Sequence, residues 1–146
     1  MNNTKRLKIN FKKKTKKILV DMTVSILHHG HIRLLKKASK LGNVYVGLTK
    51  DTDVKKHKGY NTEIKFKHRK EILEAIKYVY KVIPSNFLIT NKYIKDNKFD
   101  FIIHGSDYRG DIEKKKTKVF KRTKNISSTK LRNKIYKTEI LLKYAK

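Results

Sequence analysis

The sequence contains no cysteine, only 12 acidic residues against 39 basic ones, and no long apolar run. The absence of cysteine excludes disulfide bonds, thiol nucleophiles and thiolate metal sites. No apolar run approaches the roughly 18 residues that a membrane-spanning helix requires, and the N-terminus lacks the apolar segment of a secretory signal. These absences lead us to expect a cytoplasmic protein.

The excess of basic residues gives a formal net charge of +27 at pH 7. Such a charge is typical of proteins that bind nucleic acid or another anionic surface. Most of it comes from lysines that are spread along the chain, so solvated surfaces and a polyanion site both remain open as explanations. Residues 1–16 are polar, basic and without hydrophobic periodicity, and we interpret them as a flexible tail, with contact to anionic membrane lipid as a further hypothesis.

The hydrophobic pattern from residue 17 onward predicts alternating strands and helices in a single domain, residues 17–146. Strand-like segments at 17–21, 43–48, 78–83 and 99–103 alternate with helix-like segments at 30–41, 66–77 and 89–97, and a short strand at 118–120 precedes a last helix. Gly42 stands where a C-cap glycine would close the first helix, and residues 50–60 are expected to form a loop. The alternation predicts a Rossmann-like, three-layer α/β fold, with a parallel sheet, helices on both faces and ligands at the carboxyl ends of the strands.

The most informative motif is His28-His29-Gly30-His31, at the turn between the first predicted strand and helix. It places two imidazoles one helical turn apart, where unpaired backbone N–H groups also point outward, and such a corner suits phosphate. A zinc site is a weaker interpretation, because the chain has no cysteine and no obvious third ligand at a matching spacing. Two ordinary surface histidines are the other alternative.

Further polar clusters follow the later strands. They are Gly105-Ser106-Asp107-Tyr108, Arg122-Thr123 and Ile126-Ser127-Ser128-Thr129. Taken singly, the first is a common turn and the last is an ordinary helix N-cap. Together with the histidine pair they would converge on one edge of the sheet. Such a group of phosphate-binding side chains and backbone N–H groups suits phosphoryl or nucleotidyl transfer without a covalent nucleophile.

Residues 18 to about 134 resemble the cytidylyltransferase family of the HxGH nucleotidyltransferases, which transfer a nucleotide to a phosphorylated or phosphonylated acceptor. Four blocks carry the resemblance in the family's order: residues 28–36, residues 68–84, residues 103–108 and residues 122–130. The resemblance implies that His28 and His31 stabilise charge on the α-phosphorus as pyrophosphate leaves. It also implies that Lys58 approaches the α-phosphate and the acceptor.

The same resemblance implies the remaining site residues and partners. Nucleotide-binding positions would be Thr23, Gly30, Asp107, Tyr108, Arg122, Thr123, Ile126, Ser127 and Ser128, and acceptor-binding positions would be Tyr60, Arg69 and Lys77. A homodimer is implied, and Mg²⁺ (Mg2+) is expected to accompany CTP. Because carboxylates are scarce, we expect phosphate and water, rather than protein side chains, to hold most of the ion.

The sequence departs from the family's pattern at four places. Ser25 stands where aspartate is common, Ser106-Asp107-Tyr108 replaces a usual pair of aspartates followed by tryptophan, Asn125 replaces a usual glycine, and Tyr60 replaces a second loop lysine of some members. The departures put the geometry of the first turn, the handling of metal and the identity of the acceptor in question.

The acceptor is not fixed by these motifs. The block Arg-Thr-x-x-Ile-Ser, at residues 122–127, is similar to compact family members that act on glycerol 3-phosphate, whereas residues 20–22, 46–48 and 103–105 look like members that act on small phosphonates. Phosphocholine, phosphoethanolamine and sugar phosphates also stay open. An adenylyltransferase of the same fold is a rival, and a basic nucleic-acid-binding module is the alternative from another functional class.

Overall fold

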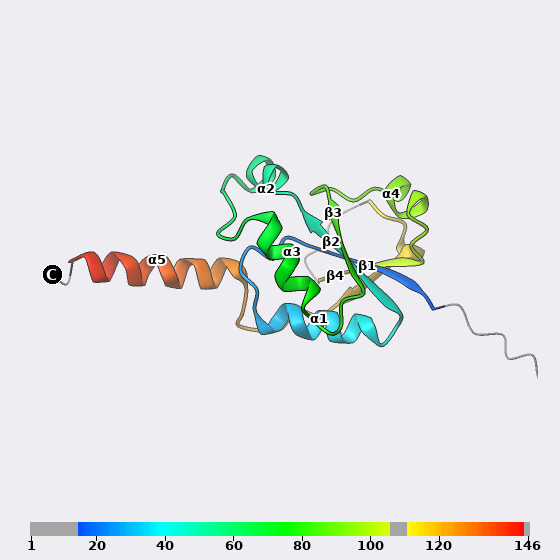
Figure 1. The fold of residues 1–146 in the computed structure, drawn as a ribbon, viewed down its shortest axis with the longest axis horizontal. Coiled ribbons are helices and arrows are strands. Elements are labelled where there is room, and N and C mark those ends of the chain that lie inside the picture. The colour runs from blue at the N-terminus through cyan, green and yellow to red at the C-terminus, as the bar shows by residue number, and fades with distance from the viewer. Residues whose placement is uncertain (1–14, 106–110, 145–146) are drawn as a thin grey trace, which may run out of the picture.

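A computed structural model describes residues 15–105 and 111–144. Along the chain the elements are β1 (Lys17–Met22), α1 (His29–Ser39), β2 (Asn43–Thr49), α2 (Asp51–Lys58), α3 (Phe66–Glu74), β3 (Lys81–Ser85), α4 (Asn91–Asp96), β4 (Phe101–Gly105), a 3-10 turn (Lys114–Lys116), β5 (Thr117–Phe120) and α5 (Ser128–Tyr144). The strands form one sheet in the order β3-β2-β1-β4-β5, and every neighbouring pair is parallel (Figure 1). The expected Rossmann-like parallel sheet is confirmed.

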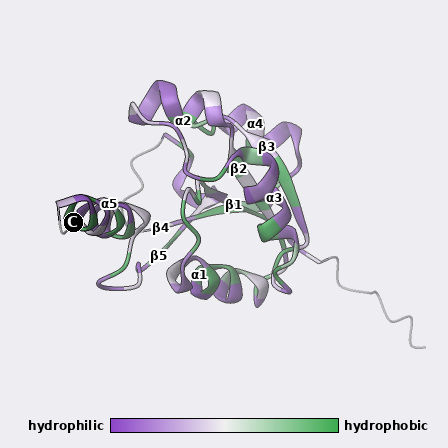
Figure 2. Cartoon of the chain, turned by 60° about the vertical axis from the view of Figure 1, so that its left-hand side comes forward, coloured by the Kyte–Doolittle hydropathy of each residue, from purple (hydrophilic) through white to green (hydrophobic). Residues whose placement is uncertain are grey.

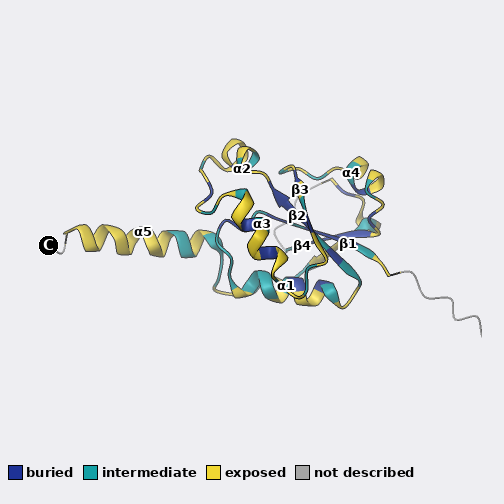
Figure 3. Cartoon of the chain, in the orientation of Figure 1, coloured by how far each residue is buried: buried dark blue, intermediate teal, exposed yellow. Residues whose placement is uncertain are grey.

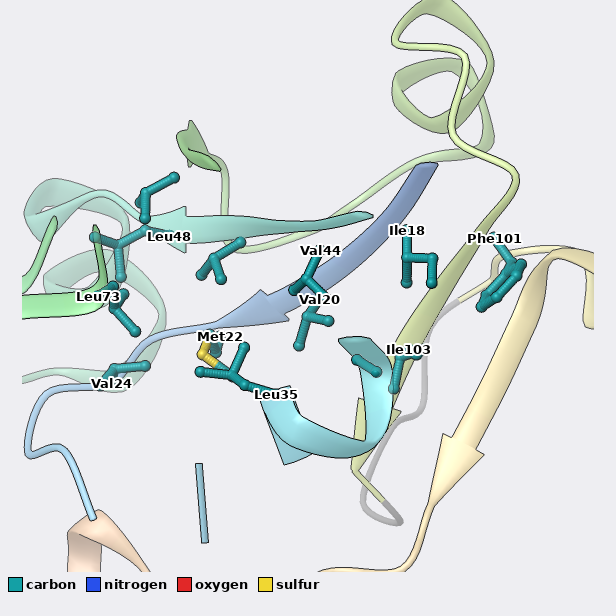
Figure 4. Close-up of a cluster of buried hydrophobic side chains, with 13 residues drawn as sticks. Ile18, Val20, Met22, Val24, Leu35, Val44, Leu48, Leu73, Phe101 and Ile103 are labelled. Carbon is teal, nitrogen blue, oxygen red and sulfur yellow. The ribbon is translucent and has the colours of Figure 1, made fainter. Parts of the chain in front are cut away.

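Side chains alternate along the central strand and fill a core on each face of the sheet. Ile18 and Val20 point to the face that is covered by Leu35 of α1 and Leu73 of α3 (Figure 4). Leu19 packs on the opposite face, against Ile94 of α4, Phe99 and Ile102. Helices therefore cover both faces, and the three-layer arrangement predicted from the sequence is confirmed.

The third strand lies further along the chain than its pattern suggested. The alternation at 78–83 predicted a strand there, but residues 78–80 lie before the strand, and β3 runs from Lys81 to Ser85, through Pro84. Proline cannot donate to a sheet, and it is tolerated here because β3 is an edge strand.

Residues 51–58 form the helix α2, where the sequence predicted a loop. Val54 is its one buried residue, so the segment carries almost no apolar periodicity. The signals that favour the helix are electrostatic and steric: Asp51 and Asp53 lie in its first turn, lysines lie in its last turn, and Gly59 closes it with a φ of 76°. Lys58 is consequently the last residue of a helix rather than a loop residue.

Gly42 does not cap α1 as predicted, because α1 ends at Ser39 and is capped by Lys40 in a right-handed conformation. Its role is a close approach between chain segments. A Cβ atom at Gly42 would lie 2.4 Å from the carbonyl oxygen of Lys16, where the chain enters β1.

Helix α5 leaves the sheet and runs outward from it, and nearly its whole length is exposed (Figures 1 and 3). Figure 2 shows that hydrophobic and hydrophilic residues are mixed along this helix. Among the described residues, its first turns are the part that approaches the body of the protein, through Ser128 and Arg132. Within the described ranges, no helix is both long enough and apolar enough to cross a membrane.

Candidate active site

A pocket of about 480 Å³ lies at the carboxyl ends of the strands. Its walls come from the turn that follows β1, residues 87–89 after β3, the end of β4, residues 120–123 at the end of β5 and the start of α5. Parallel strands end at the same edge of the sheet, so residues more than one hundred positions apart in the chain, such as Asp21 and Thr129, meet here.

The histidine motif forms both the first turn of α1 and one wall of the pocket. His28 is the N-cap, and its Nδ1 accepts a hydrogen bond from the backbone N–H of Gly30 at 3.1 Å. In return, Nδ1 of His31 accepts the backbone N–H of His28 at 3.3 Å, which completes a capping box. A Cβ atom on Gly30 would lie 2.9 Å from the His28 ring, so glycine is the residue that lets the ring close over the helix end.

Both imidazoles are held in their neutral form. Burial and the neighbouring His28 and Arg122 lower the pKa of His31 to about 3, and burial, His29 and Arg122 lower the pKa of His28. Because each Nδ1 accepts a backbone hydrogen bond, the proton of each neutral ring is carried by Nε2. The motif therefore offers two fixed Nε2–H donors, with the ring centroids 3.9 Å apart.

Lys58 reaches the pocket from the end of α2. Its Nζ donates to Oγ1 of Thr23 at 3.3 Å, and Oγ1 of Thr23 lies 3.5 Å from Oγ1 of Thr49. The ammonium also lies 5.7 Å from the ring centroid of Phe87, which forms part of the pocket wall. The side chain thus stands between the turn after β1 and the segment after β3.

Arg69 has a different position from the one predicted for an acceptor-binding residue. Its side chain is 1% exposed and donates to the carbonyl oxygens of Thr23, Thr49 and Ile64, and to Oδ1 of Asp51 at 2.6 Å. A guanidinium that is enclosed in this way cannot contact a bound acceptor. We correct its predicted role to that of a positioning residue, which fixes the backbone under Lys58.

The start of α5 forms another wall of the pocket. The backbone N–H of Lys130 donates to Oγ of Ser127 at 3.1 Å, and Oγ of Ser128 donates to the carbonyl oxygen of Ile26 at 3.0 Å. Asn125, just before this turn, has a φ of 63°, a left-handed conformation that asparagine adopts more readily than most residues. Glycine adopts this conformation at no steric cost, so the backbone here agrees with the glycine that the resemblance led us to expect at this position.

The pocket is strongly cationic. Among the described residues that line it, the side chains with a positive charge are Arg33, Lys37, Lys58, Lys121 and Arg122, and the carboxylate is that of Asp21. Burial raises the pKa of Asp21 to about 7, against the opposing effects of the hydrogen bond with Ser85 and the charge of Lys58. Cations, neutral N–H donors and a helix N-terminus in one cavity suit a ligand with several phosphate groups.

A family model for cytidylyltransferase-like proteins matches residues 23–134. The chain belongs to the cytidylyltransferase-like family. It is 37% identical over 129 residues to a glycerol-3-phosphate cytidylyltransferase of Bacillus subtilis (strain 168), with 82% of this chain and 97% of that enzyme covered. An enzyme of the same name from Staphylococcus aureus (strain NCTC 8325 / PS 47) is 34% identical, with 83% and 96% covered. An ethanolamine-phosphate cytidylyltransferase of Dictyostelium discoideum is 28% identical over 82% of this chain and 36% of its own length.

A solved structure has the same fold. The lipopolysaccharide core biosynthesis protein of Thermoplasma volcanium GSS1 superposes with a TM-score of 0.57 at 22% identity, and the match covers 86% of this chain and 89% of that one. The family assignment and this likeness agree with the fold that the sequence predicted.

The pocket of this cytidylyltransferase-like protein gathers most of the residues predicted from the sequence. Those that line it are Thr23, His28, Gly30, His31, Lys58, Tyr60, Arg122, Thr123, Ile126, Ser127 and Ser128. Asp107 and Tyr108 lie outside the described residues. Lys77 is a second correction: it is exposed and precedes β3, which places it toward the amino edge of the sheet, away from the pocket.

Several pocket residues were not predicted. Asp21, Phe87, Leu88 and His104 line the cavity from the ends of β1, β3 and β4. Their common signal is their position just inside or just after the carboxyl end of a strand. For Phe87 and Leu88 that signal was lost, because the end of β3 was predicted too early in the chain.

Proposed function

We propose that this protein transfers CMP from CTP to glycerol 3-phosphate, giving CDP-glycerol and pyrophosphate. The observation that carries the proposal is the pair of neutral Nε2–H donors in a cationic pocket, in a chain that matches 97% of the length of a glycerol-3-phosphate cytidylyltransferase. The polar groups that line the pocket suit the triphosphate and the phosphate of the acceptor better than they suit a nucleic-acid duplex.

In the proposed reaction, a phosphate oxygen of the acceptor attacks the α-phosphorus of CTP, and the bond to the β-phosphate oxygen breaks as pyrophosphate leaves. His28 and His31 donate from Nε2 to the oxygens on which charge develops. Lys58 neutralises charge between the acceptor phosphate and the α-phosphate, and Arg122 and the N-terminus of α5 hold the departing phosphates. Each such donor typically contributes about 10²–10³ in rate.

The cofactor in this proposal is Mg²⁺ bound to the triphosphate. Of the described residues that line the pocket, Asp21 offers a carboxylate, so phosphate oxygens and water are the main ligands we propose. When bound, the ion would neutralise charge on the leaving pyrophosphate. Removal of divalent ions with a chelator is expected to abolish turnover, and added Mg²⁺ to restore it.

The decisive experiment is an acceptor panel. Purified protein is incubated with labelled CTP and, separately, with glycerol 3-phosphate, phosphoethanolamine, phosphocholine, a sugar phosphate and a small phosphonate, and release of pyrophosphate is measured. We expect the highest kcat/KM with glycerol 3-phosphate. A higher kcat/KM with another acceptor would identify that compound, and not glycerol 3-phosphate, as the substrate. Turnover with ATP but not with CTP would make the protein an adenylyltransferase.

We further propose that the enzyme works in the cytoplasm as a homodimer. Two exposed apolar side chains of α5, Ile135 and Leu142, are seven residues apart and so lie on one face of the helix, and they support a partner surface on each chain. Sedimentation equilibrium measures the assembly directly, and a monomer at all concentrations would contradict it.

Contact of the basic residues 1–16 with anionic membrane lipid is the remaining proposal, supported by eight basic residues and no acidic one within residues 1–17. Deletion of residues 1–16 should then reduce binding to liposomes that contain anionic lipid. Equal binding with and without these residues would refute it.

A further inference from the structure

The guanidinium of Arg132, on the second turn of α5, joins three segments that are far apart in the sequence. Its Nη2 donates to Oγ of Ser25 at 2.9 Å and to Oε2 of Glu63 at 3.1 Å, and its Nε pairs with Oε1 of the same carboxylate. Its Cζ also lies 4.0 Å from the ring centroid of Tyr60. We call this group of contacts the Arg132 clasp.

The clasp is enclosed enough to restrain the chain. The Arg132 side chain is 12% exposed and that of Glu63 is 27% exposed, whereas the pair Lys143–Glu139 further along α5 is 73% and 57% exposed. The hydrogen bond from Arg132 lowers the pKa of the Glu63 carboxyl, so the carboxylate stays charged at neutral pH. A two-pronged arginine–carboxylate contact with a ring stacked on it has a fixed geometry, unlike an exposed lysine pair.

Each segment held by the clasp carries a group that faces the pocket. Ser25 precedes His28 by three residues, Tyr60 lies two residues after Lys58 and itself lines the pocket, and α5 begins with Ser128. Arg132 and Glu63 do not line the pocket, so any effect they have on the reaction passes through those groups.

The turn at Ser25 also needs support. Val24, just before it, has a φ of 48°, which a β-branched residue rarely adopts and which persists only where the surrounding structure holds it. Arg69 holds the carbonyl oxygen of Thr23 on one side of Val24, and Arg132 holds the hydroxyl of Ser25 on the other. The strained turn is therefore braced by two arginines.

We propose that Arg132 is a positioning residue that holds residues 58–63 and the turn after β1 in a fixed position relative to the nucleotide site. This inference rests on the proposed cytidylyl transfer. Loss of the clasp releases Tyr60 and Lys58 on the acceptor side. The start of α5 keeps its own anchor, the hydrogen bond from Ser128 to Ile26. The expected signature is therefore a lower kcat and a higher KM for the acceptor, with little change in the affinity for CTP.

The test compares Arg132→Ala with Lys134→Ala, which removes the same charge from an exposed position two residues away on the same helix. We expect Arg132→Ala to lower kcat roughly 10- to 100-fold, as misplacement of a reacting group does, and to raise the acceptor KM. Lys134→Ala should match the wild type. Arg132→Lys keeps the charge without the fork and should fall in between, and added guanidinium ion should partly restore Arg132→Ala.

Glu63→Gln provides a second variant, in case Arg132→Ala lowers the melting temperature enough to confuse its kinetics. It should show the same kcat and KM changes in weaker form. A wild-type kcat and acceptor KM in both variants would overturn the proposal. So would a loss confined to the CTP affinity.

A readout without turnover separates this proposal from the proposed function. CTP should protect Lys58 from an amine-reactive reagent in the wild type, as measured by mass spectrometry, and this protection should be lost in Arg132→Ala but kept in Lys134→Ala. If the wild type releases no pyrophosphate with any acceptor, the proposed function fails, while the protection experiment still decides the role of Arg132. Equal protection in all three proteins would refute it.

Discussion

The side chain of His31 accepts a hydrogen bond from the backbone of His28 at 3.3 Å, so the two histidines of the motif are each other's structural support. His28 in turn caps α1 through Gly30. The residues that we propose to act on the triphosphate are therefore also the residues that begin the helix. Variants of this motif need to separate the two roles.

His28→Asn makes that separation. Asparagine is a good N-cap, so the helix start should be kept, while the ring and its Nε2–H are lost. We expect kcat to fall about 10²- to 10³-fold with little change in unfolding free energy, whereas His28→Ala should lose the same activity and also about 0.5–2 kcal/mol of stability. His29→Ala is the matched control, because His29 is exposed and caps nothing, and it should leave both quantities unchanged. Equal activity of His28→Asn and the wild type would remove His28 from the reaction.

The low pKa of His31 predicts acid sensitivity. Its pKa of about 3 in the folded protein lies below the ordinary value of 6.5, so the unfolded chain binds more protons between these values. Stability should then be unaffected above about pH 6.5 and should decline as the pH falls toward 3. His31→Gln keeps an acceptor for the capping box without a titrating ring, and denaturant titrations at pH 4.5 and pH 7.5 should show a smaller difference than in the wild type. An unchanged difference would show that another group causes the loss of stability at acid pH.

Asp21 predicts the opposite dependence on pH. Its pKa of about 7 lies above the ordinary value of 3.8, so the folded protein binds the extra proton between these values. Stability should fall as the pH rises from about 4 to 7, because the buried carboxyl must then ionise. Asp21→Asn should remove this part of the pH dependence and should be more stable than the wild type at pH 8 in the absence of nucleotide. An unchanged slope between pH 4 and pH 7 in Asp21→Asn would show that another group causes this pH dependence.

The enclosed position of Arg69 predicts that its replacement strongly lowers stability and also lowers activity. Arg69→Met removes the donors to three carbonyl oxygens, and it leaves Asp51 without its charged partner. We expect a loss of about 3–5 kcal/mol in unfolding free energy by denaturant titration, and a lower kcat in whatever protein stays folded. Lys67→Met, on an exposed face of the same helix, should cost less than about 0.5 kcal/mol. A small loss in Arg69→Met would show that water replaces the guanidinium.

The sequence alone predicted the parallel sheet, the helices on both faces and the position of the histidine motif. These features depend on local signals: β1 is built around the short apolar run Ile18-Leu19-Val20, and the capping motif spans only four residues. Where apolar periodicity was weak or misleading, the prediction was wrong. Helix α2 buries one residue and was taken for a loop, and the alternation at 78–83 placed β3 too early.

Only the tertiary structure decided what the arginines do. Arg69 and Arg132 are two among 39 basic residues, and nothing in their neighbouring sequence distinguishes an enclosed guanidinium from a solvated one. Their roles arise from partners far along the chain, 46 residues away at Thr23 and 107 residues away at Ser25. The sequence by itself determined which residues could hold phosphate, because that chemistry belongs to the side chains. Folding decided that Arg69 and Arg132 instead support the turn after β1. The enclosure of a side chain and its hydrogen-bond partners exist only once distant segments of the chain meet.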